Sequence, residues 1–399
     1  MRARTSIHSF IVVVAMSVLL TTVAAAQDTT AAGRLRAEIA ALREKLEASQ
    51  VEFDSSLAAL NDSMRIGRPG TTRFLVSGYA VGEYRTVRNG PSVFTTEVSP
   101  ILLWQLNERI LIAAEPEFEV GERLEIALEY AHVSVLAADF LTLGIGKFIT
   151  PFTIYNERLH PAWINKLPGS PLPFGHGGIA PGSAVGAYAR GGIPAGVTRL
   201  SYAIYAVNAP ELMKEGEEAG EVEPADASEQ RAFGGRVGLF LMPAGVELGY
   251  SYQTSDVVNV HGVDFTLSKQ SRALRGRVDV RVEGVVSEAA VGPFPGEMPG
   301  DPDRILVNNR RTGGYGQIAY RPSLSGSRVA RGLEFVGRYD GMNRPDWVGG
   351  PKGNDTRRMT VGVSYALTPS MVMKLAFQRT ANTVADDARS LLFQVATGF

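Results

Sequence analysis

The sequence predicts an all-β protein, a transmembrane antiparallel β-barrel of about 16 strands preceded by a signal peptide and a short α-helical coiled coil. Three observations predict this class. Between residues 74 and 399, segments of about ten residues alternate apolar and polar positions, as outer-membrane strands do. Very short connections alternate with long ones along the same stretch. After the amino-terminal segment, no continuous apolar run reaches the length of a transmembrane helix.

The first 26 residues are typical of a secretory signal peptide. Arg2 and Arg4 precede an apolar run from Phe10 to Leu20, and Ala24 to Ala26 supply a small-residue cleavage site. The run is too short to span a bilayer as a permanent helix, and an uncleaved anchor is the alternative. Cleavage removes two arginines and no acid from 40 basic and 41 acidic residues, which leaves a net charge of −3. This balance argues against nucleic acid as a partner.

Residues 27–66 favour a periplasmic coiled coil. Apolar residues recur there with the four-three spacing of heptads, at Leu35, Ile39, Leu42, Leu46, Phe53 and Leu60. A single amphipathic helix lying against the barrel mouth is the alternative. Residues 67–73 form a linker, because Pro69 and Gly70 end the helix. The barrel domain then covers residues 74–399. The chain contains no cysteine, so this domain has to be stable without disulfides.

The alternation is clearest in two segments. In "LIAAEPEFEV" three glutamates share one parity while Phe118 and Val120 lie on the other, and "RGRVDVRVEGVV" alternates charged residues with valines in the same way. A soluble sandwich also alternates, with its polar face in bulk water. In a barrel the polar face meets the lumen and the apolar face meets lipid.

Connection lengths separate these two interpretations. Tight joints at 106–109, 242–245 and 367–370 alternate with long ones at 150–183, 208–230 and 286–311, as expected for short turns on one rim and long loops on the other. The expected strands are 73–86, 93–106, 109–120, 124–137, 139–149, 184–192, 197–208, 231–242, 245–255, 257–267, 272–285, 312–322, 330–341, 356–367, 370–381 and 389–399. An even number returns both ends of the barrel to the periplasmic side. A loop around 257–267 instead of a hairpin would leave about 14 strands, and 18 is not excluded.

The chain closes on "LLFQVATGF", in which Leu391, Phe393, Val395 and Phe399 share one parity. This segment predicts a last strand that pairs with the first one.

Several phrases resemble the phosphate-selective porin O/P family. They are "LTLGIGKFITPFTIYNERL" (141–159), "LEFVGRYDGMN" (333–343) and "MTVGVSYALTPSMVMKLAFQRT" (359–380), together with the closing Phe399. The resemblance implies a barrel of 16 strands, a homotrimer, and a role for Phe399 as the signal read by the barrel-assembly machinery. Outer-membrane lipid and lipopolysaccharide are then the surrounding partners, in the cell outer membrane of a Gram-negative-type bacterium.

The connection 150–183 is the best candidate for a constriction. It follows the fifth expected strand, which makes it the third extracellular loop, and its five prolines between Pro151 and Pro173 indicate a fixed path. The charged or titratable residues that it presents to the pore are Glu157, Arg158, His160 and Lys166. A cap that stabilises the outer rim or the trimer is the alternative.

Lumen parity yields two clusters of opposite charge. The acidic cluster comes from two neighbouring strands and consists of Glu115, Glu117, Glu119, Glu125 and Glu129. The basic cluster comes from distant strands and consists of Arg236, Arg275, Arg277, Arg281, Arg338 and Lys374. The resemblance implies an arginine ladder and a lysine cluster, but this chain has few lysines and interposes Asp279 and Glu283, which puts phosphate selectivity in doubt. The alternative for each position is that a wet lumen simply requires polar side chains.

These observations predict a porin for passive diffusion of small polar solutes and ions, with a weak phosphate-like anion preference. A non-conducting structural or adhesin barrel is the main alternative. A barrel enzyme is the other, since His132 and Ser134 share a parity, but no Asp or Asn is placed to orient the histidine. No HExxH, GxSxG or P-loop motif occurs, so we expect no enzyme activity, cofactor or metal.

Overall fold

The computed structural model describes residues 73–399 except 122, 176, 213–221, 291–304, 307–308, 344–346, 349–354 and 384–386. Sixteen antiparallel strands close into one barrel, which confirms the predicted fold class and strand number. In order around the barrel the strands are β1 (Arg73–Val87), β2 (Ser92–Gln105), β3 (Ile110–Val120), β4 (Leu124–Ala138), β5 (Leu141–Ile149), β6 (Ser183–Ala195), β7 (Thr198–Asn208), β10 (Arg231–Leu241), β11 (Val246–Thr254), β12 (Val258–Ser271), β13 (Gly276–Ala289), β15 (Arg310–Arg321), β16 (Leu333–Asn343), β18 (Asp355–Thr368), β19 (Met371–Asn382) and β20 (Ala388–Gly398).

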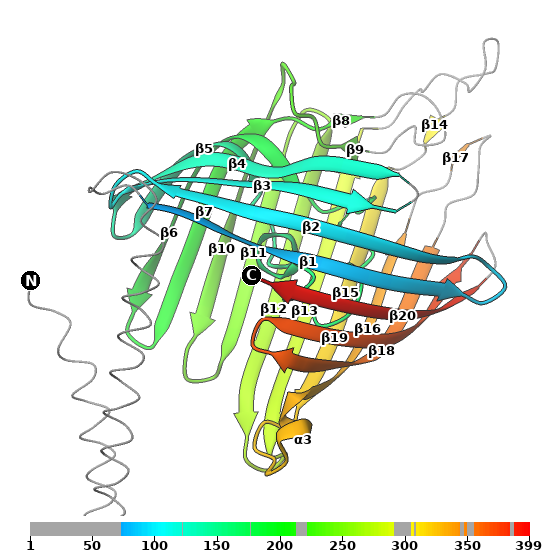
Figure 1. Cartoon of the computed structure of the whole chain (residues 1–399). Helices are drawn as coiled ribbons and strands as arrows, with labels where there is room; N and C mark the ends of the chain where they lie inside the picture. The colour runs from blue at the N-terminus through cyan, green and yellow to red at the C-terminus, as the bar shows by residue number, and fades with distance from the viewer. Residues whose placement is uncertain are drawn as a thin grey trace, which may run out of the picture. The chain divides into compact units, whose positions relative to one another are not determined.

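The remaining elements lie in the connections. A π-helical turn, η1 (Tyr155–Leu159), follows β5, and a short helix, α3 (Arg328–Gly332), precedes β16. Two small ribbons pair β8 (Glu211–Leu212) with β9 (Val222–Glu223) and β14 (Ile305–Leu306) with β17 (Trp347–Val348). Figure 1 shows α3 at the opposite end of the barrel from both ribbons, so short and long connections occupy different rims.

The barrel closes where the last strand pairs with the first. β20 lies antiparallel to β1 in a register that sets Gly398 opposite Tyr79, and the two strands run side by side in Figure 1. Two backbone hydrogen bonds extend this pairing, from Gly78 N to Phe399 O (3.0 Å) and from Phe399 N to Gly78 O (2.9 Å). The Ser77 hydroxyl also donates to Phe399 O at 2.8 Å. The closing strand predicted from "LLFQVATGF" is thus confirmed.

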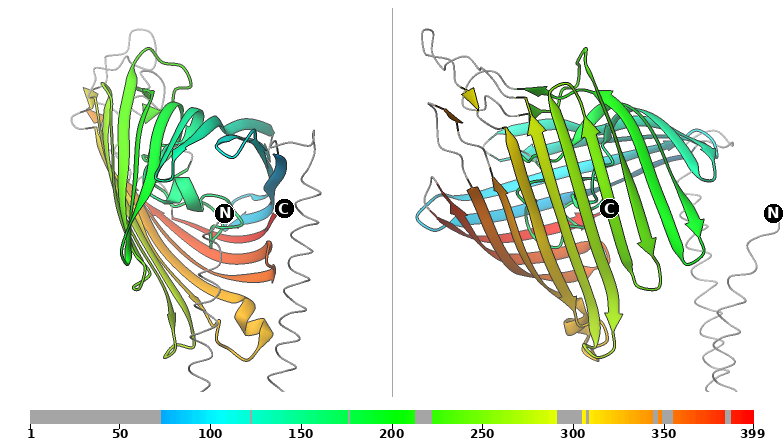
Figure 2. Two further views of the ribbon diagram at one scale, coloured as in Figure 1. Left: turned by 90° about the vertical axis from the view of Figure 1, so that its left-hand side faces the viewer. Right: turned by 180° about the vertical axis from the view of Figure 1, so that it is seen from behind.

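Alternation along each strand separates an inner polar face from an outer apolar one. On β16 the inward Arg338 is 2% exposed, while the outward neighbours Phe335 and Tyr339 are 51% and 56% exposed. The same division holds on β13 and β19, and Figure 2 shows the strands tilted around a common interior. An apolar exterior around a polar interior is the arrangement of a barrel in lipid.

One expected hairpin and two local differences from the expected strands have physical causes. The Ser255 hydroxyl accepts from the amides of Val257 and Val258, so a tight turn joins β11 to β12 and the hairpin forms. Ser327 caps α3 by accepting from Ala330 N, which delays β16 until Leu333. Arg275 was expected within a strand, but it has a φ of 50° and lies in the turn before β13.

The predicted signal peptide, coiled coil and linker up to residue 72 lie outside the described residues and stay predictions. Among the residues that are described, no helix is long and apolar enough to cross a membrane.

Gly78 is required at the closing seam. A Cβ on Gly78 would lie 2.4 Å from the carbonyl oxygen of Ser99 and 2.9 Å from Cα of Pro100, and its φ of 152° also disfavours a side chain. We expect Gly78→Val to lower the folded fraction, measured by heat-modifiable migration in gel electrophoresis. Gly82→Val is the matched control, because a Cβ there meets nothing within 4 Å and leaves the fold intact. Equal folding of the two variants would contradict the importance of this close approach.

Candidate pore lining and constriction

The connection between β5 and β6, residues 150–182, lies against the inner face of the barrel. In Figure 1 it is seen in blue-green within the ring of strands. Its first turn is held by backbone amides: Thr153 N donates to Ser251 Oγ at 3.0 Å, and the amides of Ile154 and Tyr155 donate to Glu283 Oε2 at 3.1 and 3.2 Å. Glu283 is inward on β13 and buried, so its carboxylate serves as an anchor for η1.

An aromatic cluster fixes the same half of the loop. Phe152, Tyr155 and Phe174 pack on the inward side chains Val260 and Tyr315. The ring centroids of Tyr155 and Phe174 lie 5.5 Å apart, and those of Phe174 and Tyr315 lie 5.8 Å apart nearly at right angles. An edge-to-face contact such as that of Phe174 with Tyr315 adds about 0.5–1.5 kcal/mol to the burial of the pair. The aromatic residues of the loop therefore cover the inner wall at β12, β13 and β15.

Further along, the loop is bound to another part of the barrel wall. There its backbone carbonyls accept hydrogen bonds from basic side chains of the wall. Arg338 Nη1 donates to Gly169 O at 3.1 Å, and Arg358 donates to Ser170 O. Lys374 Nζ donates to Ala162 O. The loop thus touches strands from β11 to β19. Long basic side chains of the barrel wall therefore hold the loop in place by donating to its backbone carbonyls.

The four residues expected at the constriction lie in two environments. Arg158 pairs with Glu247 at 2.9 Å, and Glu157 pairs with Arg190 at 3.4 Å. Lys166 pairs with Glu334 at 2.6 Å. His160 Nδ1 contacts the carbonyl oxygen of Asn156, and burial lowers the pKa of His160, with the Glu129 carboxylate acting in the opposite direction. All four lie on the inner side of the barrel, but three are already paired.

Most side chains of the basic cluster already have a polar partner within the protein. Arg236 binds Asp264 at 2.7 Å and Glu247 at 3.3 Å. The remaining members make these contacts: Arg281 with Asp279 at 2.9 Å, Arg338 with Asp340 at 3.1 Å, Lys374 with Gln394 at 2.7 Å, and Arg277 with Ser268 at 2.8 Å. Arg275 is exposed in the turn that immediately precedes β13.

The acidic cluster comes together on β3 and β4 as parity predicts. Glu115 is 2% exposed, and Glu117, Glu119 and Glu129 are partly buried. A register shift between Glu115 and Pro116 adjusts the pairing of the two strands around them. Glu125 lies at the rim, where it is 62% exposed and pairs with Arg123 at 3.1 Å.

Sequence reasoning missed several residues that the structure brings to this site. Glu97 of β2 joins the acidic cluster by pairing in register with Glu119. Asp264, Asp340 and Arg358 belong to the ion pairs of the wall. Each has the lumen parity of its strand, so the alternation could have found them. Their partners could not be found that way, because they come from other strands.

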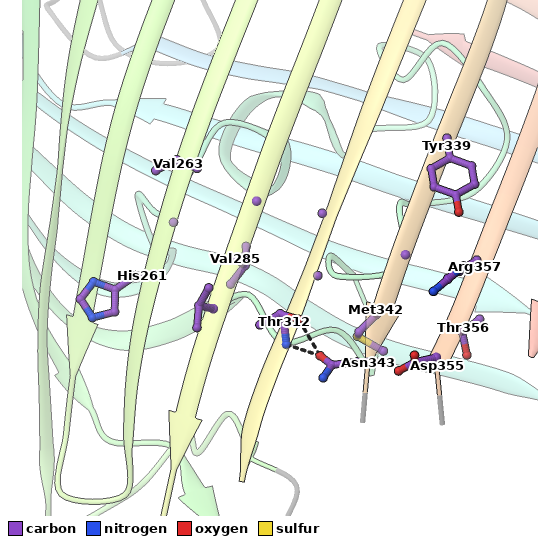
Figure 3. A pocket seen from close by; sticks show the side chains of 16 residues that line it. His261, Val263, Val285, Thr312, Tyr339, Met342, Asn343, Asp355, Thr356 and Arg357 are labelled. Carbon is purple, nitrogen blue, oxygen red and sulfur yellow. Dashed lines mark hydrogen bonds between the residues drawn. The ribbon is translucent and has the colours of Figure 1, made fainter. Parts of the chain in front are cut away.

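One cavity lies on the outer wall and not in the lumen. It has a volume of about 510 Å³ and spans β12, β13, β15, β16 and β18. Figure 3 shows the outward side chains His261, Val263, Tyr339 and Arg357 around it. Several glycines, among them Gly314, also line it. A second cavity of about 300 Å³ lies inside the barrel beside Glu157, Arg158, Arg190 and Arg236.

His132 and Ser134, the pair considered for a barrel enzyme, do not hydrogen-bond to each other as a catalytic pair would. The Ser134 hydroxyl donates to the carbonyl oxygen of Leu111, and His132 Nδ1 has no hydrogen-bond partner among the described residues. Within the same part of the chain, no three acidic or histidine side chains are grouped to hold a metal ion.

No family model matches this chain, and no curated protein matches it either. Solved structures are similar to it. Salmonella typhi OmpF in complex with daunomycin is 12% identical, with a TM-score of 0.55 over 82% of this chain and 98% of that one. The loop L8 deletion mutant of OmpT, an outer membrane protein of Vibrio cholerae, is 11% identical, with a TM-score of 0.52 over 83% of this chain and 100% of that one. These similarities concern the fold, which is that of a transmembrane β-barrel.

The Arg236 ion pair should be critical for stability. Arg236→Met leaves Asp264 buried without its cation, and removal of one partner of a buried pair costs about 3–5 kcal/mol. We expect a loss of that order in the free energy of unfolding, measured by urea titration in lipid vesicles. Arg123→Met is the control, since an exposed pair such as Arg123–Glu125 contributes about 0–1 kcal/mol. Similar losses in both variants would contradict a special role for the buried pair.

Proposed function

We propose that this chain is an outer-membrane porin, a water-filled channel for passive diffusion of small polar solutes and ions. The observation that carries the proposal is the inner wall itself. A ring of 16 strands with an apolar exterior encloses charged side chains and one inserted loop. Barrels of this size leave an aqueous channel, whereas eight strands are filled by their own side chains.

In this proposal residues 150–182 form the constriction. The loop is anchored to the wall at Glu283, at Arg338 and at Lys374, so it holds a fixed position within the lumen. A fixed obstacle narrows the path and sets the size limit for solutes. The predicted alternative, a cap on the rim, is less well supported because these anchors lie inside the barrel.

The finer expectations are part of the same proposal. They comprise a homotrimer, recognition of Phe399 by the barrel-assembly machinery, contact with lipopolysaccharide, and a coiled coil in the periplasm. They rest on the resemblance to the phosphate-selective porin O/P family and on the amino-terminal heptads. The expected weak anion preference has less support, because Arg236, Arg281 and Arg338 each have a carboxylate partner.

Planar-bilayer recording of the purified protein tests the proposal. We expect stepwise ohmic conductance, and closures in groups of three if the trimer forms. A barrel that inserts but carries no current would contradict the porin function and favour a structural or adhesin role.

Deletion of Thr153–Gly178 tests the constriction separately. Because this segment occupies the lumen, its removal should raise single-channel conductance. Heat-modifiable migration verifies that the shortened barrel still folds. An unchanged conductance in a folded variant would contradict the assignment of the loop.

A further inference from the structure

The lumen carries compensated charge on one part of its wall and uncompensated charge on another. Beside the inserted loop, basic side chains have acidic partners at ion-pair distance. The pairs are Arg236 with Asp264, Arg281 with Asp279, Arg338 and Arg358 with Asp340, Lys166 with Glu334, and Arg158 with Glu247. A paired guanidinium and carboxylate have little net field a few ångströms away.

Burial further removes these cations from the path of a solute. The side chains of Arg338 and Arg236 are 0% and 4% exposed. Lys374, which has no carboxylate within 4.0 Å in the described part of the chain, is buried between Gln394 and the carbonyl of Ala162 in the loop. These groups act as anchors of the loop and do not meet a passing anion.

The opposite situation holds on β2, β3 and β4. Five inward carboxylates form what we term the acidic wall: Glu97, Glu115, Glu117, Glu119 and Glu129. None of them has a basic side chain within 4.0 Å among the residues that the structure describes. Glu97 and Glu129 are contacted by the neutral hydroxyls of Ser99 and Ser183, at 2.9 and 3.0 Å. Glu97 lies directly opposite Glu119 in the strand pairing, so like charges face each other.

Glu115 provides an independent indication that this wall requires a positive partner. It is almost completely buried, and its Oε1 has no hydrogen-bond partner among the described residues. A buried carboxylate oxygen without a donor is costly unless a cation or water supplies the missing interaction. The neighbouring hydroxyls of Tyr79 and Tyr130 donate to this carboxyl group but carry no positive charge, and the side chain lies beside Glu97, Glu117 and Glu129.

We propose that the channel prefers cations over anions, and that the acidic wall sets this preference. The inference rests on the proposed porin function and specifies its solutes as small inorganic and organic cations. Rings or walls of carboxylates favour cations in pores through their field. No metal-binding cluster is required, because the preference arises from the summed charge along the path.

The test is the reversal potential of single channels in a KCl gradient. We expect a K⁺ to Cl⁻ permeability ratio above 1, larger at 0.1 M than at 1 M salt because counterions screen charges beyond about 10 Å at 0.1 M and about 3 Å at 1 M. The triple variant Glu97→Gln, Glu117→Gln, Glu119→Gln should lower the ratio by at least about twofold. The matched control is Glu108→Gln, Glu229→Gln, Glu288→Gln, three exposed carboxylates away from the inner wall, which should leave the ratio unchanged.

The possible outcomes are distinguishable. Absence of current in the unaltered protein overturns the proposed function. Current with a ratio at or below 1, or a ratio that the triple variant does not change, overturns the cation preference alone.

A second measurement covers the case in which the triple variant fails to fold. Because the chain has no cysteine, Glu117→Cys offers one reactive thiol. An anionic methanethiosulfonate should restore the K⁺ preference of this variant, and a cationic one should lower it further. Equal effects of the two reagents would overturn the inference.

Discussion

The closed hydrogen-bonded ring is the constraint on which the rest of the structure depends. In hydrocarbon an unpaired backbone amide or carbonyl costs several kcal/mol, so a sheet can cross a bilayer only if it has no edges. The pairing of β1 with β20, extended by Gly78 and Phe399, removes the last edge. Once the ring is closed, every strand has one face toward lipid and one toward the interior. The polar half of each strand is then enclosed, and that enclosure creates the lumen.

The interior is organised by a second layer, the loop between β5 and β6. Glu283 shows how the two layers are joined: one carboxylate accepts from two loop amides and from the Tyr315 hydroxyl at 2.5 Å. Arg338 and Lys374 act similarly from other strands, through loop carbonyls. Several charged side chains that the strand alternation assigns to the pore therefore hold the loop against the wall. On the acidic wall, by contrast, no strand or loop supplies a basic side chain within 4.0 Å among the described residues.

Much of the barrel could be predicted from the sequence because strand period and turn chemistry are local properties. The hairpin at Ser255 and the final strand follow from residues that lie close together in the chain. Arg275 was misplaced because its turn conformation depends on a positive φ that alternation does not reveal. The ion pairs of the inner wall could not be predicted, because the partners of Arg236 and Arg338 are chosen by strand neighbourhood and by the path of the loop. Parity shows which side a residue faces, but not what it meets there.

In a membrane, one face of each strand should meet water in the lumen while the other meets lipid. Single cysteines at Glu97 and Glu117, compared with Val98 and Phe118 on the same strands, test it directly in liposomes with a hydrophilic maleimide. We expect rapid labelling at 97 and 117 and protection at 98 and 118. Equal labelling at all four positions would contradict it.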